Sequence, residues 1–348
     1  GRMPRWRQSH LPECSMPRLA VLLSALALAF GLALSAQAEC RGENIFSSLP
    51  PEKLAAIEAA TSAVPFPTGN FWRATRGDQV ITIAGTYHLD DPRHAANLAA
   101  LAPAIRAASA VLVEATPEDE KALMALIAKD PSKIVITTGP TLAEQLPPEV
   151  WTQLSEAMSE RGVPAFMTAK FRPWYVIAVL SIPPCMMAAM AEEPKGLDGL
   201  VIDTALAANV PVRGLEPFDT IFGIFDQMTE AETIAMIQST LALEDQVEDQ
   251  AVTLADSYFT GESRKVWELM RQVSYDLPGY SRDEVDAEFA AMEVLLMSQR
   301  NRAWIPVLTE AATDGPVFAA FGALHLSGEA GVLNLLQAEG FTLEELPL

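Results

Sequence analysis

The sequence predicts a mixed α/β fold in which strands from both ends of the chain form one central sheet around a large helical insert. Short β-rich runs occupy residues 70–84 and 109–115, and again 316–321 and 341–346, whereas about 219–314 has helical spacing. Neither end alone has enough strands for a stable sheet, so we expect the two ends to share one. Half of the residues are hydrophobic, which is enough to bury a large core.

The N-terminal 38 residues predict a secretory signal peptide. Residues 19–34 are apolar and are followed by the small-residue motif AQA, so we expect cleavage before Glu39, with Met16 as an alternative start of translation. The other interpretation is a membrane anchor, for which the apolar run is slightly short. The remaining chain, 39–348, is then a single periplasmic or secreted domain without a stable membrane span.

Two cysteines remain after such cleavage, Cys40 and Cys185, because Cys14 belongs to the leader. An exported chain folds in an oxidising compartment, where one pair favours a disulfide; two free thiols are the alternative. The net charge of −21 excludes nucleic-acid binding through phosphates, since the basic footprint is lacking. The sequence leaves the oligomeric state open.

The first part of the domain predicts a hairpin at 70–84, turning at Arg76-Gly77-Asp78, and then a helix at 92–108. A buried strand at 109–115 leads to a helix at 117–129, which begins with proline and has acidic residues in its first turn. His94, on the first of these helices, is expected at the surface.

The middle and the end of the chain continue with helices and two short strand runs. The stretch 170–184 is apolar on all sides but too short to span a bilayer, which indicates a buried helix. In order, we expect helices at 147–162, 170–184 and 196–210, a strand at 211–216, helical breaks near Thr260-Gly261 and Leu277-Pro278-Gly279, a strand at 316–321, a helix at 328–338 that includes Glu329 in its first turn, and a strand at 341–346.

Two matching motifs carry the strongest functional signal. VITIAGTYHLDD places Gly85 and His88 after one apolar strand, and VFAAFGALHLSGE places Gly322 and His325 after another. Carboxyl ends of strands are where α/β proteins present ligand-binding groups, and glycine permits close approach of the backbone. Imidazole serves as a metal ligand or as a general base.

Glu114 ends a third apolar strand in VLVEATP. A carboxylate there must pair with a base or bind a metal, because an unpaired buried charge is costly. His88, Glu114 and His325 are therefore a candidate set for a divalent ion of the Mn, Co or Zn class. The same residues also suit metal-free acid–base chemistry, and their spacing does not decide between the two.

Five segments together resemble the TraB/GumN (TraB/PrgY/GumN) family over about Cys40 to Leu346, and this family is similar to the Tiki proteases and to the erythromycin-esterase-like and ChaN-like proteins. They are GTYHLDDPRH, VLVEATPE, KGLDGLVIDTALAANVPVRGLEP, SQRNRAWIPVL and FGALHLSGEAGVLNLLQAEGFTL. The resemblance implies a central sheet that carries the site.

Position by position, the resemblance implies a metal held by His88, Glu114 and His325 and a water activated for amide hydrolysis. Arg300, in QRN, would neutralise an oxyanion or clamp a substrate carboxylate. Supporting candidates are Gly85, Asp198, Glu216, Asn301 and Gly322.

The leading functional hypothesis is an exported metal-dependent hydrolase of the peptidase or amidase type, acting on a peptide or small-molecule substrate. One alternative is a non-catalytic envelope protein that binds a peptide, haem or another small ligand. Another is a metal-independent esterase that uses histidine and glutamate.

Overall fold

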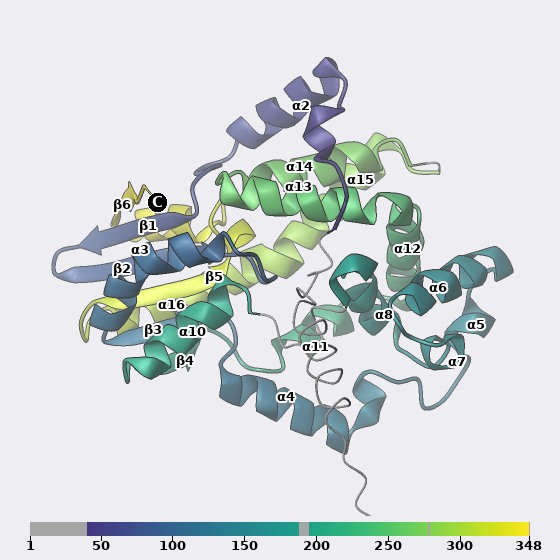
Figure 1. The fold of residues 1–348 in the computed structure, drawn as a ribbon, viewed down its shortest axis with the longest axis horizontal. Coiled ribbons are helices and arrows are strands. Elements are labelled where there is room, and N and C mark those ends of the chain that lie inside the picture. The colour runs from purple at the N-terminus through teal and green to yellow at the C-terminus, as the bar shows by residue number, and fades with distance from the viewer. Residues whose placement is uncertain (1–39, 188–194, 278, 348) are drawn as a thin grey trace, which may run out of the picture. The chain divides into compact units, whose positions relative to one another are not determined.

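The computed structural model describes residues 40–187, 195–277 and 279–347, and Cys40–Leu348 forms one compact unit. Its centre is a six-stranded sheet with the order β4-β3-β5-β2-β1-β6 (Figure 1). The strands are β1 (Phe71–Arg76), β2 (Gln79–Thr86), β3 (Ala110–Val113), β4 (Val212–Gly214), β5 (Val317–Gly322) and β6 (Thr342–Glu345). Strands from both ends of the chain do share one sheet, with helices between them, as predicted. The predicted signal peptide lies outside the described residues.

The strand directions bring the two histidine motifs to one edge of the sheet. β2 runs parallel to β5, and Thr86 lies opposite Gly322, so both strands end at the same level. β3 is parallel to β5 on its other side and pairs Val113 with Ala320, so Glu114 follows at this same edge. β1 pairs antiparallel with both β2 and β6. β6 is therefore the edge strand on the side of the sheet away from β3.

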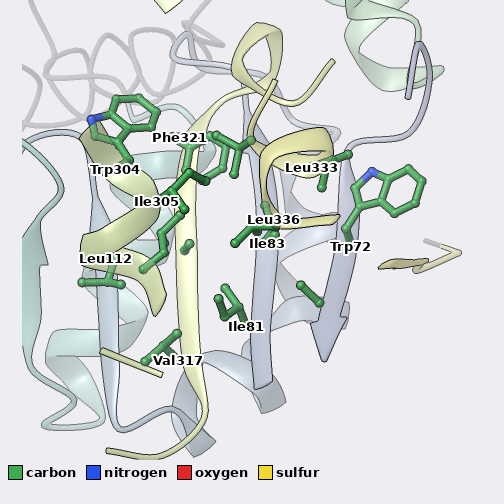
Figure 2. Close-up of a cluster of buried hydrophobic side chains, with 14 of the residues drawn as sticks. Trp72, Ile81, Ile83, Leu112, Trp304, Ile305, Val317, Phe321, Leu333 and Leu336 are labelled. Carbon is green, nitrogen blue, oxygen red and sulfur yellow. The ribbon is translucent and has the colours of Figure 1, made fainter. Parts of the chain in front are cut away.

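Alternating side chains of the sheet pack into two separate cores, as expected for strands buried on both faces. On one face Ile81, Ile83 and Phe321 contact Trp304 and Ile305 of α16 (Gln299–Ala311), together with α17 (Val332–Ala338) (Figure 2). The other face packs against three helices: α3 (His94–Ala107), α10 (Leu197–Ala207) and α13 (Val247–Phe259).

A third core belongs to helices that do not contribute to either sheet face. Leu154, Met158, Val176 and Ile237 are fully buried among α5 (Leu142–Gln145), α6 (Pro148–Glu160), α8 (Pro173–Leu180) and α12 (Glu230–Leu241). The helical part of the chain therefore contains a core made from 142–180 together with α12, in addition to the helices that cover the sheet.

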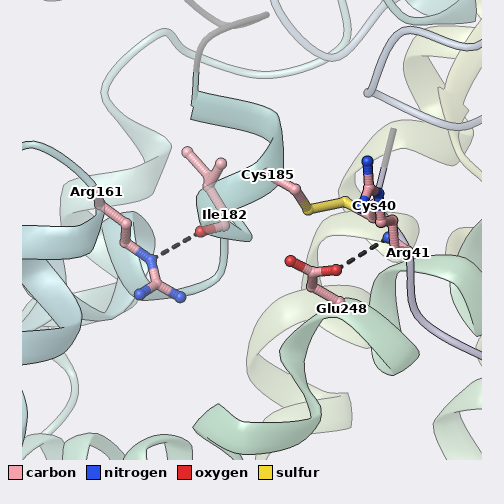
Figure 3. Close-up of a disulfide and its surroundings, with 6 residues drawn as sticks. All are labelled: Cys40, Arg41, Arg161, Ile182, Cys185 and Glu248. Atoms are coloured by element: carbon pink, nitrogen blue, oxygen red, sulfur yellow. Dashed lines mark hydrogen bonds between the residues drawn. A yellow bond between two sulfur atoms is a disulfide. The ribbon is translucent and has the colours of Figure 1, made fainter. Parts of the chain in front are cut away.

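The Cys40–Cys185 disulfide joins the start of the described chain to this helical region, as the sequence predicted (Figure 3). Cys185 lies in η3 (Pro184–Met186), directly after α8. Beside it the buried guanidinium of Arg161 donates to the carbonyls of Leu180 and Ile182 and pairs with Glu244 at 2.6 Å. The bridge spans 145 residues, so it constrains the unfolded chain strongly.

The remaining helices are short or cover the outside. They are η1 (Ile45–Ser47), α2 (Pro51–Ser62), α4 (Pro117–Lys129), η2 (Pro131–Lys133), α7 (Ala165–Thr168), α11 (Thr220–Asp226), η4 (Glu244–Gln246), α14 (Ser263–Ser274), α15 (Arg282–Glu293), the π-helical turn η5 (Val294–Ser298) and η6 (Ala323–His325). No helix within the described ranges is both long and apolar enough to cross a membrane.

Two local predictions were wrong. The last helix begins at Val332 and not at 328, so Glu329 lies in the preceding turn and not in the first turn of the helix. His94 opens α3 as expected, but its side chain points inward and the residue is 1% exposed. For His94 the aromatic enclosure formed with Tyr258 and Phe259 decides the outcome, and the local pattern does not.

Candidate functional site

The three strand-end groups converge on one point of the sheet edge. A Cβ on Gly322 would lie 3.2 Å from His88 Nε2, 3.4 Å from Glu114 Oε1 and 3.6 Å from His325 Cδ2. Gly322 has an ordinary extended backbone, so its lack of a side chain serves the close approach of these groups and not a special turn. The rings of His88 and His325 therefore both approach the sheet edge at Gly322.

Arg300 lies within this group and ties the strand ends to α16. It follows the π-helical turn η5, and its Nη1 donates to the carbonyl of Leu296 in that turn. Its Nε and Nη2 donate to Glu216 at 2.9 and 2.6 Å, and Nη2 also donates to Glu114 at 2.6 Å. We call His88, Glu114, Glu216, Arg300 and His325 the site cluster.

The guanidinium of Arg300 has no N–H left over. A guanidinium carries five N–H donors. Four are directed at Glu216, Glu114 and the Leu296 carbonyl, and the fifth, on Nη1, faces His325 Nε2 at 3.2 Å. The expected role of Arg300 as a clamp for a substrate carboxylate would require one of these contacts to break.

Asn301 fixes the proton on His325. The Asn301 amide donates to the carbonyls of His325 and Ala330, so its Oδ1 must be the atom that contacts His325 Nδ1 at 2.6 Å. Nδ1 consequently carries the proton, and Nε2 presents its lone pair to Arg300. Burial, partly opposed by Glu114, lowers the pKa of His325 to about 4, so the imidazole is neutral at pH 7.

Glu114 is the fixed negative charge of the cluster. Burial alone would raise its pKa, but the positive charge that His325 gains below pH 4, the charges of Arg300 and His88 and the Gly322 N–H outweigh burial and lower the pKa to about 2. Its Oε1 accepts the Gly322 N–H at 2.6 Å, while Oε2 accepts Arg300. The carboxylate is thus ionised throughout the physiological range.

His88 is in a different environment. Its side chain is 57% exposed, and Nδ1 lies 3.3 Å from Asp198 Oδ1 on α10. Partial burial alone would lower the pKa of His88, but Asp198, and further off Glu114, raise it above the ordinary 6.5. An imidazole with one nitrogen facing a carboxylate and the other facing the site has the arrangement of an oriented base.

The residues as they stand do not fit a three-ligand metal site. Imidazole and carboxylate are suitable ligands, but the one lone pair of His325 Nε2 is directed at Arg300. No three histidine, cysteine or acidic side chains of the described residues are grouped so that they could hold one ion. Metal binding by these residues is therefore still only a prediction. It would require Arg300 to move away from His325 Nε2.

Two surface cavities lie elsewhere in the described parts of the chain. One of about 550 Å³ is lined by Arg106 and residues of α10, and one of about 420 Å³ lies beside the disulfide. The first contains Asp203 and Thr204, the second Arg41 and Glu248, and no residue of the site cluster lines either.

Sequence reasoning missed two residues that contact the first motif. His94 Nε2 lies 2.9 Å from the Leu89 carbonyl, and the hydroxyl of Tyr258 donates to the Gly85 carbonyl at 3.0 Å. Tyr258 is 173 positions away along the chain, and no local pattern marks it. For His94, the one available signal was its scarcity, since the chain has only four histidines.

Comparison with known proteins agrees with the motifs on which the site rests. No curated protein and no solved structure matches the chain. The model of the TraB/PrgY/gumN family matches residues 70–345, a range that includes every residue of the site cluster and all six strands. The chain therefore belongs to the TraB/PrgY/gumN family.

Proposed function

We propose that this protein is a hydrolase that cleaves an amide or ester bond, with His88 as the general base. The observation that carries the proposal is the position of the His88 ring: Nε2 points to the centre of the site cluster while Nδ1 faces Asp198. A base whose pKa lies near the working pH is the most effective, and the raised pKa of His88 suits this role.

The step follows from these contacts. Neutral His88 takes a proton from water through Nε2 while the water oxygen forms a bond to the carbonyl carbon of the substrate. The imidazolium then gives this proton to the leaving nitrogen or oxygen as the C–N or C–O bond breaks. Asp198 and Glu114, both close to the ring, stabilise the imidazolium between the two events.

The other members of the cluster have supporting roles in this proposal. His325 is not the base, because its pKa is about 4 and its free lone pair accepts from Arg300. Arg300 holds Glu114 and Glu216 together and offsets part of their charge. Trp304 Nε1 donates to Glu216 at 3.1 Å and fixes that carboxylate from the other side.

A substrate panel tests the proposal. Purified protein is assayed against peptides, amides and esters, and His88→Gln is compared with Asp90→Asn, an exposed neighbour in the same loop. We expect hydrolysis of at least one class, lost in His88→Gln and retained in Asp90→Asn. An activity that survives in His88→Gln contradicts the assignment. The complete absence of hydrolysis would favour the non-catalytic binder of a peptide, haem or small ligand.

A metal-dependent hydrolase is the second candidate, and one observation favours it. Asn301 fixes His325 as the tautomer whose Nε2 carries no proton, and a hydrogen bond that fixes the tautomer in this way is a common support for a metal ligand. His88, Glu114 and His325 would hold the ion once Arg300 releases His325; the ion would polarise the carbonyl and activate water. Metal analysis of the purified protein decides: a stoichiometric ion whose removal by chelator abolishes activity favours this form.

The proposed location is the periplasm or the exterior of the cell. The disulfide supports this proposal, because such bonds persist mainly in oxidising compartments. Fractionation of cells that produce the full chain, with the mass of the N-terminus determined, tests both the location and the proposed cleavage before Glu39.

A further inference from the structure

We propose that His94, together with Tyr258, positions His88 by holding the backbone of the motif segment Gly85–Leu89. The proposal rests on the function proposed above, since it concerns the placement of the proposed base. Neither residue contacts the reacting atoms in this proposal, so both act as positioning residues.

The carbonyls of alternate residues in this segment are held by three different helices. The Gly85 carbonyl accepts the hydroxyl of Tyr258 on α13, the Tyr87 carbonyl accepts the N–H of Leu197 on α10, and the Leu89 carbonyl faces His94 Nε2 on α3. β2 ends at Thr86, and Leu89 lies in a bend, so these contacts hold the segment beyond the strand as well as within it. The segment is therefore fixed at three points, with His88 between the last two.

The His94 ring is enclosed by aromatic side chains. The residue is 1% exposed, and its ring centroid lies 6.0 Å from those of Tyr87 and Tyr258 and 5.1 Å from that of Phe259. A carbonyl only accepts, so Nε2 must carry the proton. Nδ1 is then a buried acceptor, and it has no hydrogen-bond partner among the described residues.

Packing alone does not account for a histidine at this position. An unpaired buried nitrogen costs free energy, and a phenylalanine would fill the same aromatic enclosure without that cost. The property that histidine has and phenylalanine lacks is the N–H that reaches Leu89, the residue directly after His88. The hydrogen bond from His94 to the Leu89 carbonyl is therefore the property that distinguishes histidine from phenylalanine at this position.

His88 needs such support because its own ring is not fixed by the core. The side chain is 57% exposed, in contrast to His325, which is 6% exposed and packs 4.5 Å from Trp304. The backbone must then hold His88 Nδ1 against Asp198 and Nε2 toward Glu114. A displacement of a reacting group by about 1 Å costs roughly 100-fold in rate.

Three variants of the full chain test the proposal by kcat, KM, thermal stability and the two-bond ¹H–¹⁵N imidazole spectrum. His94→Phe keeps the ring and removes the donor; His94→Gln keeps a donor within reach of Leu89; Phe259→Leu disturbs the enclosure without removing a hydrogen bond to the loop. We expect His94→Phe to lower kcat by about 10- to 100-fold with little change in KM and to move the His88 signals. We expect His94→Gln to restore most of the loss, and Phe259→Leu to lower stability alone.

The proposal is overturned if His94→Phe leaves kcat and the His88 signals unchanged, if His94→Gln loses as much as His94→Phe, or if Phe259→Leu gives the same kinetic loss. Should His94→Phe not fold, Tyr258→Phe replaces it, because it removes only the hydroxyl that reaches Gly85; unchanged His88 signals there also overturn the proposal. If His88→Gln keeps full activity, the proposed function fails, yet the imidazole spectra still decide whether His94 positions His88.

Discussion

The two Gly-x-x-His-Leu motifs share a sequence frame and lie side by side, yet they have opposite physical properties. Gly85–Leu89 continues β2 and is held by its carbonyls, which leaves the His88 side chain 57% exposed. Gly322–Leu326 turns at once into η6, which carries His325 into the core, 6% exposed. One motif thus presents an accessible imidazole, and the other contributes a buried one.

The pKa values of the two histidines diverge for the same reason. His325 is enclosed by Trp304 and Asn301 and faces a guanidinium, so burial dominates and its pKa falls to about 4. His88 faces the carboxylate of Asp198, which raises its pKa. Paired motifs therefore do not imply paired roles, because the surroundings of each ring decide which protonation state is stable.

The largest expected effect is on catalysis. His88→Gln removes the proposed base from an exposed position, so we expect kcat to fall by about 10²- to 10⁴-fold, with an unchanged melting temperature at alkaline pH, where the charge of His88 no longer contributes to stability. His325→Gln should lower both activity and stability, because it leaves the Asn301 and Arg300 contacts unpaired. Steady-state kinetics and thermal melts of both variants separate the effect on activity from the effect on stability. Equal losses of activity and of stability in His88→Gln and His325→Gln would refute the difference between the motifs.

The pH dependence of stability should show opposite signs for the two rings. The pKa of His325 is lowered from 6.5 to about 4, so its contribution is complete above 6.5 and is lost as the pH falls toward 4, on the order of 3 kcal/mol. The pKa of His88 is raised, so its contribution is complete below 6.5 and is lost as the pH rises through the folded value. Urea unfolding from pH 4 to 8, for wild type and each histidine-to-glutamine variant, measures this; an acid-side loss as large in His325→Gln as in wild type would contradict it, since only the smaller loss from carboxylates such as Glu114 should remain.

Gly322, the glycine of the second motif, tests whether the reaction takes place at the centre of the site cluster. A methyl group at Gly322 would lie 3.2 Å from His88 Nε2 and 3.4 Å from Glu114 Oε1. We expect Gly322→Ala to reduce kcat by about 10- to 100-fold while the fold is retained, because the methyl group occupies the space that a reacting atom needs. An alanine variant with full activity would show that the reaction takes place elsewhere.

Gly85, the glycine of the first motif, should affect the stability of the fold when it is replaced. A Cβ at Gly85 would lie 2.6 Å from Leu326 Cδ1 and 3.0 Å from Ala323 Cα, where β2 packs against η6. We expect Gly85→Ala to destabilise the protein by about 1–3 kcal/mol. Gly223→Ala, in α11, is the contrast: a Cβ there meets no atom within 4 Å, so no clash arises, and replacing a helical glycine should raise stability by up to about 1 kcal/mol.

Much of the fold could be read from local patterns. The proline and acidic start of α4, for example, gives a capping box in which Thr116 accepts from the Asp119 N–H. Strand-end positions placed Glu114, His88 and His325 at one edge, because parallel strands end together. Apart from the bond of Arg300 to the Leu296 carbonyl four positions earlier, the donors of Arg300, the tautomer of His325 and the inward turn of His94 depend on partners 5 to 186 positions away, which no local pattern encodes.

The sequence by itself determined the α/β class, the disulfide partners and the residue types that meet at the sheet edge, because hydrophobic periodicity and strand polarity are local and directional. Only the tertiary structure decided how the two histidines differ. Exposure, the orientation of Asp198 and Asn301 and the saturation of Arg300 arise when distant helices pack on the sheet. Those contacts set the electrostatic environment of each ring, and a pKa is a property of that environment.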